Sequence, residues 1–146
     1  MDNTSSQINI SFKLTSDISN IDYKKKKDYS NVYNIQGMLN IRINNELFFS
    51  EEIALLEFYI QVKKWFRNKL DGSFYYNTIE VEDDDNPLIK FVASDNKYFI
   101  SSPWGKSQII ATSSANSLIE SIKLFTESFE GELYSKYKLN PKWYIK

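Results

Sequence analysis

The sequence contains no histidine and no cysteine. Histidine is the one side chain whose unperturbed pKa lies in the physiological range, and cysteine supplies both a thiolate nucleophile and a soft metal ligand. Their absence excludes Ser-His-Asp and Cys-His catalysis, disulfide bonds, and zinc, haem or iron–sulfur sites that depend on either residue. The composition therefore favours binding over catalysis, and we expect neither an enzyme nor a cofactor.

Several targeting and surface signals are also missing. The first seven residues have neither the basic nor the apolar region of a secretory signal, and no stretch approaches the ~18 apolar residues of a membrane span. The net charge is -1, whereas general nucleic-acid binding requires a basic surface. These absences predict a cytoplasmic protein that makes no direct contact with nucleic acid or membrane.

The chain contains enough apolar residues to form one hydrophobic core, with 42% hydrophobic and 16% aromatic residues. Alternation at period two predicts seven strands. The strand candidates are 7–15, 33–43, 46–49, 74–82, 88–93, 97–101 and 108–112. Glycine is scarce, with four residues, and the Asn44-Asn45 pair is the turn signal between the second and third strands.

Two segments have the apolar spacing of amphipathic helices. The first is predicted to run from an N-cap at Ser50 to about Leu70, with Trp65 on its buried face. The second is predicted over 116–136, with Ser113 or Ser114 as its N-cap.

The element order is therefore β-β-β-α-β-β-β-β-α. It predicts an α+β two-layer sandwich, in which one mainly antiparallel sheet of six to seven strands carries both helices on one face. The opposite sheet face is then partly exposed. We expect a single domain over 1–146, with a flexible polar loop at 17–31 and a tail at 137–146 whose Trp143 and Tyr144 could dock on that face.

The strongest charge cluster is a predicted hairpin turn with five carboxylates in six residues. Its members are Glu80, Glu82, Asp83, Asp84 and Asp85. The simplest interpretation is a solvated turn, and the spacing does not match a calcium-binding loop, so we expect no metal site. The functional interpretation is an acidic docking surface that mimics nucleic-acid phosphates and enters the basic cleft of a nuclease.

Two further segments are candidates for binding. Trp104 lies in the turn after a predicted strand, where it either folds over the core or anchors an interface. The run Lys24 to Lys27 is either a solvated loop or a contact for phosphate or an acidic partner.

The order of elements resembles that of the small immunity proteins encoded beside polymorphic or contact-dependent toxins in bacteria. The likeness covers about 34–133 and rests on the Leu-Leu-Glu-Phe…Trp-Phe helix, the Phe-Tyr-Tyr strand, the acidic turn, Ser-Ser-Pro-Trp and the Leu-Ile-Glu-Ser-Ile…Phe helix. It implies tight, stoichiometric inhibition of a cognate toxin domain, often a nuclease, without catalytic residues. Glu80, Glu82, Asp83, Asp84, Asp85 and Trp104 are then the candidate partner-binding residues.

Two other interpretations stay open. The chain could be a structural or adaptor domain that forms a homodimer through its sheet face. It could also be a magnesium-dependent enzyme that uses carboxylates alone, since magnesium prefers oxygen ligands. The sequence leaves open the oligomeric state and the identity of a partner toxin.

Overall fold

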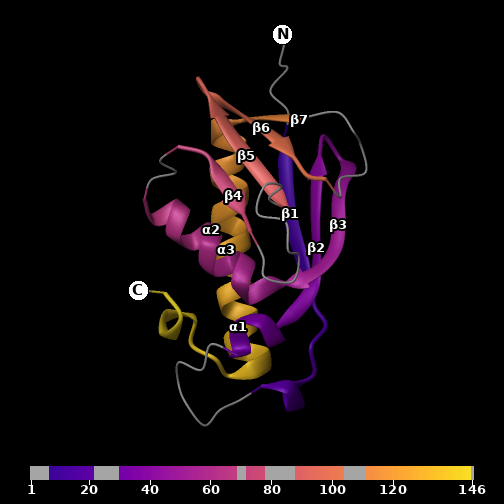
Figure 1. Cartoon of the computed structure of the whole chain (residues 1–146), viewed down its shortest axis with the longest axis vertical. Helices are drawn as coiled ribbons and strands as arrows, with labels where there is room; N and C mark the ends of the chain where they lie inside the picture. Colours follow the sequence, from indigo (N-terminus) through magenta and orange to yellow (C-terminus); the bar gives the residue numbers. More distant parts are fainter. Residues whose placement is uncertain (1–6, 22–29, 69–71, 78–87, 104–110, 146) are drawn as a thin grey trace.

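The computed structural model of the chain describes residues 7–21, 30–68, 72–77, 88–103 and 111–145 (Figure 1). Its fold class is α+β, as predicted, and all strand pairs are antiparallel. The elements are β1 (Ile8–Leu14), the 3-10 helix η1 (Ile18–Asn20), α1 (Ser30–Asn34), β2 (Gln36–Ile43), β3 (Glu46–Ala54), α2 (Leu55–Arg67), β4 (Phe74–Tyr76), β5 (Ile89–Ser94), β6 (Lys97–Ser101), β7 (Ala111–Ser114), α3 (Ala115–Tyr137) and the 3-10 helix η2 (Pro141–Trp143).

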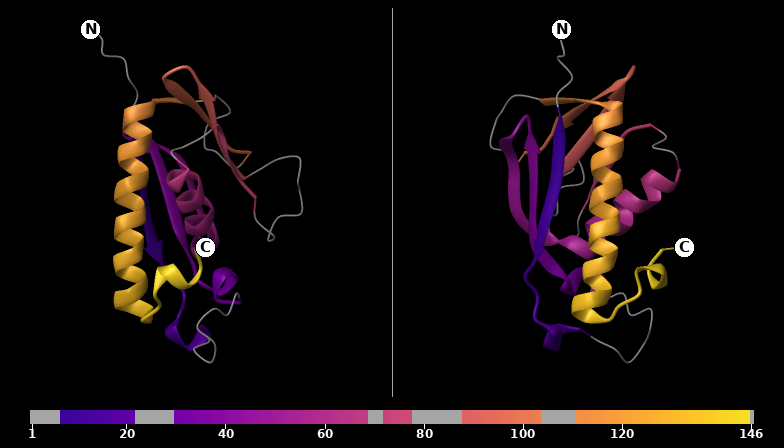
Figure 2. Two further views of the ribbon diagram at one scale, coloured as in Figure 1. Left: turned by 90° about the vertical axis from the view of Figure 1, so that its left-hand side faces the viewer. Right: turned by 180° about the vertical axis from the view of Figure 1, so that it is seen from behind.

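The predicted order of seven strands and two long helices is confirmed, but the single sheet is wrong. The strands form a three-stranded sheet, β1-β2-β3, and a four-stranded sheet, β4-β5-β6-β7. Helix α2 lies between the four-stranded sheet on one side and α3 with the three-stranded sheet on the other (Figure 2). Phe58 on α2 contacts both Tyr76 on β4 and Phe125 on α3, so the two helices do not share one face of one sheet.

The hairpin between β2 and β3 is confirmed, and its turn has the backbone that this connection requires. Asn44 and Asn45 have φ values of 54° and 71°. Two consecutive positive φ angles are characteristic of the turns that match the twist of a two-residue hairpin, and asparagine tolerates them better than most residues.

Ser50 was predicted to be the N-cap of the first long helix, and this is wrong. It lies inside β3, opposite Asn40, and its hydroxyl donates to Asn40 Oδ1 at 2.6 Å. The strand continues to Ala54, which precedes α2 without a side-chain cap. Pairing with β2 therefore outweighs the local cap signal, and α2 begins four residues later than predicted.

The second long helix follows its prediction closely. Ser114 is the N-cap of α3, and its hydroxyl oxygen accepts from Ser117 N at 3.2 Å. The helix ends at Tyr137, and Lys138 takes a left-handed conformation with φ 59°.

Helix α3 runs along the free edge of β1 rather than across a sheet face. The hydroxyl oxygens of Ser117 and Ser121 accept from Ile8 N and Ile10 N, each at 3.0 Å. Further along, Lys136 Nζ donates to Leu14 O at 3.2 Å and Tyr137 Oη donates to Ser16 O at 2.7 Å. These bonds satisfy backbone groups that an edge strand otherwise exposes.

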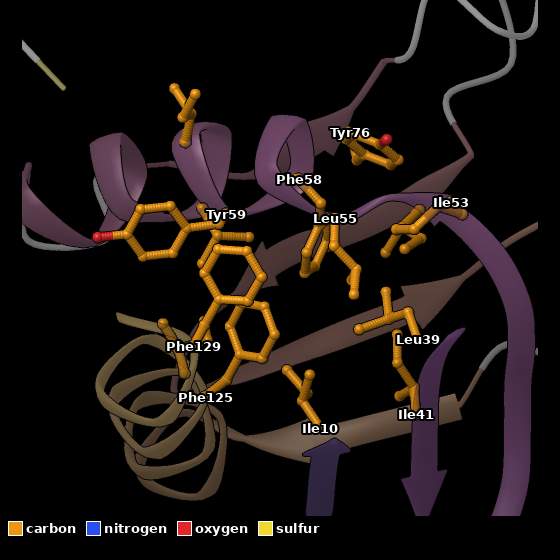
Figure 3. Close-up of a cluster of buried hydrophobic side chains, with 14 of the residues drawn as sticks. Ile10, Leu39, Ile41, Ile53, Leu55, Phe58, Tyr59, Tyr76, Phe125 and Phe129 are labelled. Carbon is orange, nitrogen blue, oxygen red and sulfur yellow. The ribbon is translucent and has the colours of Figure 1, made fainter. Parts of the chain in front are cut away.

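An aromatic cluster joins the layers. The ring of Phe58 lies 5.1 Å from that of Tyr76 on β4 and 5.5 Å from that of Phe125 on α3, both edge to face. Tyr59 stacks on Phe129 at 4.9 Å. Figure 3 shows these rings meeting the aliphatic side chains of β2 and α2. Trp65 is buried, as predicted, against the four-stranded sheet.

The C-terminal segment packs on the core rather than on an open sheet face. Leu139 and Tyr144 are buried, and Trp143 is half-buried. The Tyr144 hydroxyl accepts from Asn31 Nδ2 at 3.3 Å, so it meets α1. Within 17–31, the predicted loop, the structure describes η1, the buried Ile21 and the start of α1.

Candidate functional site

The six predicted partner-binding residues lie outside the described residues, and so does the run Lys24 to Lys27. Glu80, Glu82, Asp83, Asp84 and Asp85 fall between β4 and β5, and Trp104 falls between β6 and β7. The strands that flank both segments are described, and their register locates the points where the chain leaves and rejoins the sheet.

Both segments are attached to the same end of the four-stranded sheet. The register pairs Tyr76 with Ile89, Lys90 with Ser101, and Ile100 with Ala111. Leu88 N also donates to Tyr76 O at 2.9 Å. Because neighbouring strands lie ~4.8 Å apart, the two attachment points on β5 and β6 are adjacent.

Helix α2 holds this end of the sheet in place. Gln61 forms two hydrogen bonds with the backbone of Asn77, donating from Nε2 to the carbonyl at 2.8 Å and accepting from the amide at 3.3 Å. One turn earlier, the buried Glu57 carboxylate accepts from the Tyr76 hydroxyl at 2.8 Å. Residues four apart on a helix share a face, so α2 fixes Tyr76 and Asn77, the last described residues before the acidic segment.

The outer face of the four-stranded sheet carries aromatic side chains beside the same end. Tyr75 is 47% exposed and is aligned with Lys90. Phe99 on β6 is half-buried on the same face, and Lys97 Nζ lies 5.4 Å from its ring centroid. We did not single out these residues from the sequence. The alternation of Phe74, Tyr75 and Tyr76 was the available signal, because it turns Tyr75 away from the core.

The inner face of this sheet holds a tyrosine whose ionisation is opposed by its surroundings. Tyr98 is buried against the ring of Trp65, with ring centroids 5.7 Å apart, and burial raises the pKa of Tyr98. Its hydroxyl therefore stays neutral at physiological pH.

The described part of the chain has neither a cluster of metal-binding side chains nor a membrane-spanning helix. No group of three or more acidic, histidine or cysteine side chains is placed there to hold a metal ion. No helix among those residues has the length and apolar character needed to cross a membrane.

Comparison with known proteins gives one match. The family described as "Domain of unknown function (DUF7878)" matches residues 10–135, which extend from β1 almost to the end of α3. No curated protein and no solved structure matches the chain. The match covers most of the 146 residues, and the chain therefore belongs to the family DUF7878.

Proposed function

We propose that this protein is a cytoplasmic immunity protein that binds and neutralises a cognate toxin domain, with a nuclease as the first class of toxin to test. The observation that carries the proposal is the strand register of the four-stranded sheet. It attaches the acidic segment and the Trp104 segment to adjacent strands at one end of that sheet.

The two attached segments carry the two ingredients of a tight, selective protein interface. Clustered carboxylates accelerate association with a basic partner and select against acidic ones. A tryptophan, with the exposed ring of Tyr75 nearby on the same sheet, supplies the type of anchor that dominates binding energy. The bonds from α2 to Asn77 support the end of the sheet on which such a partner would dock.

The outer faces of the two sheets give weaker support to the alternative, in which the chain forms a homodimer. Stable homodimer interfaces are about 65% apolar. The outer face of the three-stranded sheet exposes mainly polar and charged side chains. These are Asn9, Ser11, Lys13, Arg42 and Glu52. On the four-stranded sheet, the outer face includes Lys90 and Lys97, whose charges a homodimer interface through that face would have to desolvate.

The test uses a candidate toxin domain chosen from the genes next to the one that encodes this chain. Cells that make the toxin domain should survive when this chain is co-expressed, and the purified proteins should form an equimolar complex that weakens with salt. A variant with Asp83→Lys, Asp84→Lys and Asp85→Lys should associate at least ~10-fold more slowly, because steering depends on the sign of the charge.

A matched control separates the position of the charges from net charge. Glu120→Lys, Glu127→Lys and Glu132→Lys alter net charge equally on exposed positions of α3, and this variant should keep nearly all of the association rate. If the natural chain neither protects cells nor binds the toxin domain, the proposed function is wrong. If both triple variants associate at the same rate, the acidic surface has no specific role.

A further inference from the structure

A cavity lies between the C-terminal half of α2 and the C-terminal segment, with α3 contributing one wall. Its volume is about 470 Å³, within the range of small-molecule sites. The lining residues are Tyr59, Lys63, Arg67, Glu130, Asn140, Pro141, Lys142 and Ile145. None of them belongs to the four-stranded sheet, so the cavity is separate from the site proposed for a toxin.

The α2 wall is a single stripe of three side chains. Tyr59, Lys63 and Arg67 are four residues apart, which places them on one face of the helix. Tyr59 Oη donates to Glu130 Oε2 at 2.5 Å, and Lys63 Nζ lies 2.9 Å from the same oxygen. The one carboxylate of the cavity is therefore compensated by Lys63 and held by Tyr59.

The remaining two charges of the lining are both positive. Arg67 and Lys142 have no ion pair among the residues that the structure describes, so the charges of the described lining side chains sum to two positive units. Burial raises the pKa of Tyr59, and its hydrogen bond to Glu130 raises it further, while the nearby Arg67 acts in the opposite direction. The Tyr59 hydroxyl thus stays protonated and adds no negative charge.

The other wall combines apolar surface with a fixed backbone. Asn140 Oδ1 accepts from Lys142 N at 2.9 Å and caps η2, in which Pro141 occupies the first position. The backbone of Lys142 therefore lies in an ordered turn. Pro141 and Ile145 supply apolar contact area. The ring of Tyr59 stacks on Phe129, and its hydroxyl points away from the hydrophobic cluster (Figure 3).

We propose that this cavity binds a small phosphate monoester, with Arg67 and Lys142 contacting the phosphate and Pro141 and Ile145 contacting its organic part. A phosphate monoester carries about 1.5 to 2 negative charges at pH 7, which matches the two uncompensated cations. A single carboxylate would neutralise one of them. The planar guanidinium of Arg67 also offers two parallel donors, the geometry that phosphate oxygens favour.

The test is a titration of the full chain followed by amide chemical-shift changes in NMR. The probes are inorganic phosphate, glycerol 3-phosphate and adenosine monophosphate, with glycerol and adenosine as phosphate-free controls. We expect shifts at Arg67 and Lys142 with the phosphate esters, weaker binding of inorganic phosphate, and no saturable shifts with glycerol or adenosine.

Three variants connect the binding to the cavity. Arg67→Gln and Lys142→Gln should each weaken binding of the esters by at least tenfold while the spectrum stays that of a folded chain. Lys123→Gln removes the same charge from an exposed position on α3 outside the cavity and should leave affinity unchanged. The proposal is refuted if no ester binds below about 10 mM, or if all three variants weaken binding equally, which would indicate a general charge effect.

Discussion

Gly37 on β2 lies where the three-stranded sheet meets the start of α2. A methyl group at this position would lie 2.5 Å from the backbone oxygen of Lys13 and would also overlap the side chain of Leu55. The side chain of Leu55 could adjust in part, but the carbonyl belongs to the paired strand β1. Overpacking of this kind costs about 1–3 kcal/mol, so Gly37→Ala should lower the free energy of unfolding by that amount in urea titrations.

Gly131 gives the matched control, because it is exposed on α3 and a methyl group there would have no neighbour within 4 Å. Alanine is favoured over glycine inside a helix by about 0.5–1 kcal/mol. Gly131→Ala should therefore raise the urea midpoint with an unchanged slope. Equal effects of the two substitutions would show that backbone freedom, rather than crowding, decides stability at Gly37.

At the scale of elements, α3 can follow the edge of β1 because the two elements advance by similar distances between successive contacts. Four helical residues advance about 6.0 Å, and two strand residues advance about 6.6–6.8 Å. Ser117 and Ser121 can therefore reach Ile8 N and Ile10 N in succession. The next step along both elements brings Phe125 to Phe12, with ring centroids 5.5 Å apart. Helix α3 thereby protects an edge that could otherwise pair with another chain.

This pairing predicts a specific cost for removing one hydroxyl. Ser121→Ala leaves the buried Ile10 N–H without its acceptor, which costs about 1–3 kcal/mol of folding free energy. Ser128→Ala, at an exposed position of the same helix, should change stability by less than ~0.5 kcal/mol. Native-state hydrogen exchange should show faster exchange of the Ile10 amide in the first variant alone. Unchanged protection of that amide would show that the hydroxyl is dispensable.

The elements themselves were largely predictable, because their signals are local. Ser114 caps α3 as expected, since a cap depends on backbone groups two or three residues away. Ser50 carried the same local signal followed by two carboxylates, yet it lies in β3 because pairing with Asn40 on β2 competes with the cap. That competition depends on a partner strand, so the sequence pattern alone could not reveal it.

At the scale of the whole molecule, the sequence could not predict the features that depend on contacts between residues far apart in the chain. Helix α2 packs against both β4 and α3, with Phe58 contacting each of them, and a single hydrophobic stripe does not distinguish one neighbour from two. The same limit applies to the cavity. Its walls come from residues 59–67, from Glu130 and from 140–145, and only the four-residue spacing on α2 was visible in the sequence. The acidic and Trp104 segments lie outside the described residues, so their role stays a prediction.

The fold as a whole also predicts how the stability of the protein changes at alkaline pH. Tyr59 and Tyr98 both have a raised pKa in the folded chain, mainly because burial opposes the charged form, whereas the unfolded value is about 10. Above pH ~10 the unfolded state loses protons that the folded state retains. Stability is therefore fully present below pH ~10 and falls as pH rises above that value.

Urea unfolding at successive pH values between about 9 and 11.5 measures this slope across the unfolded-state tyrosine pKa of about 10. Tyr59→Phe should be less stable than the natural chain at pH 8, because it loses the hydrogen bond to Glu130, but its stability should decline less steeply above pH ~10. Tyr75→Phe, at an exposed position, should keep the slope of the natural chain. Parallel slopes for Tyr59→Phe and the natural chain would mean that Tyr59 ionises without unfolding, and that its burial beside Glu130 does not oppose the phenolate.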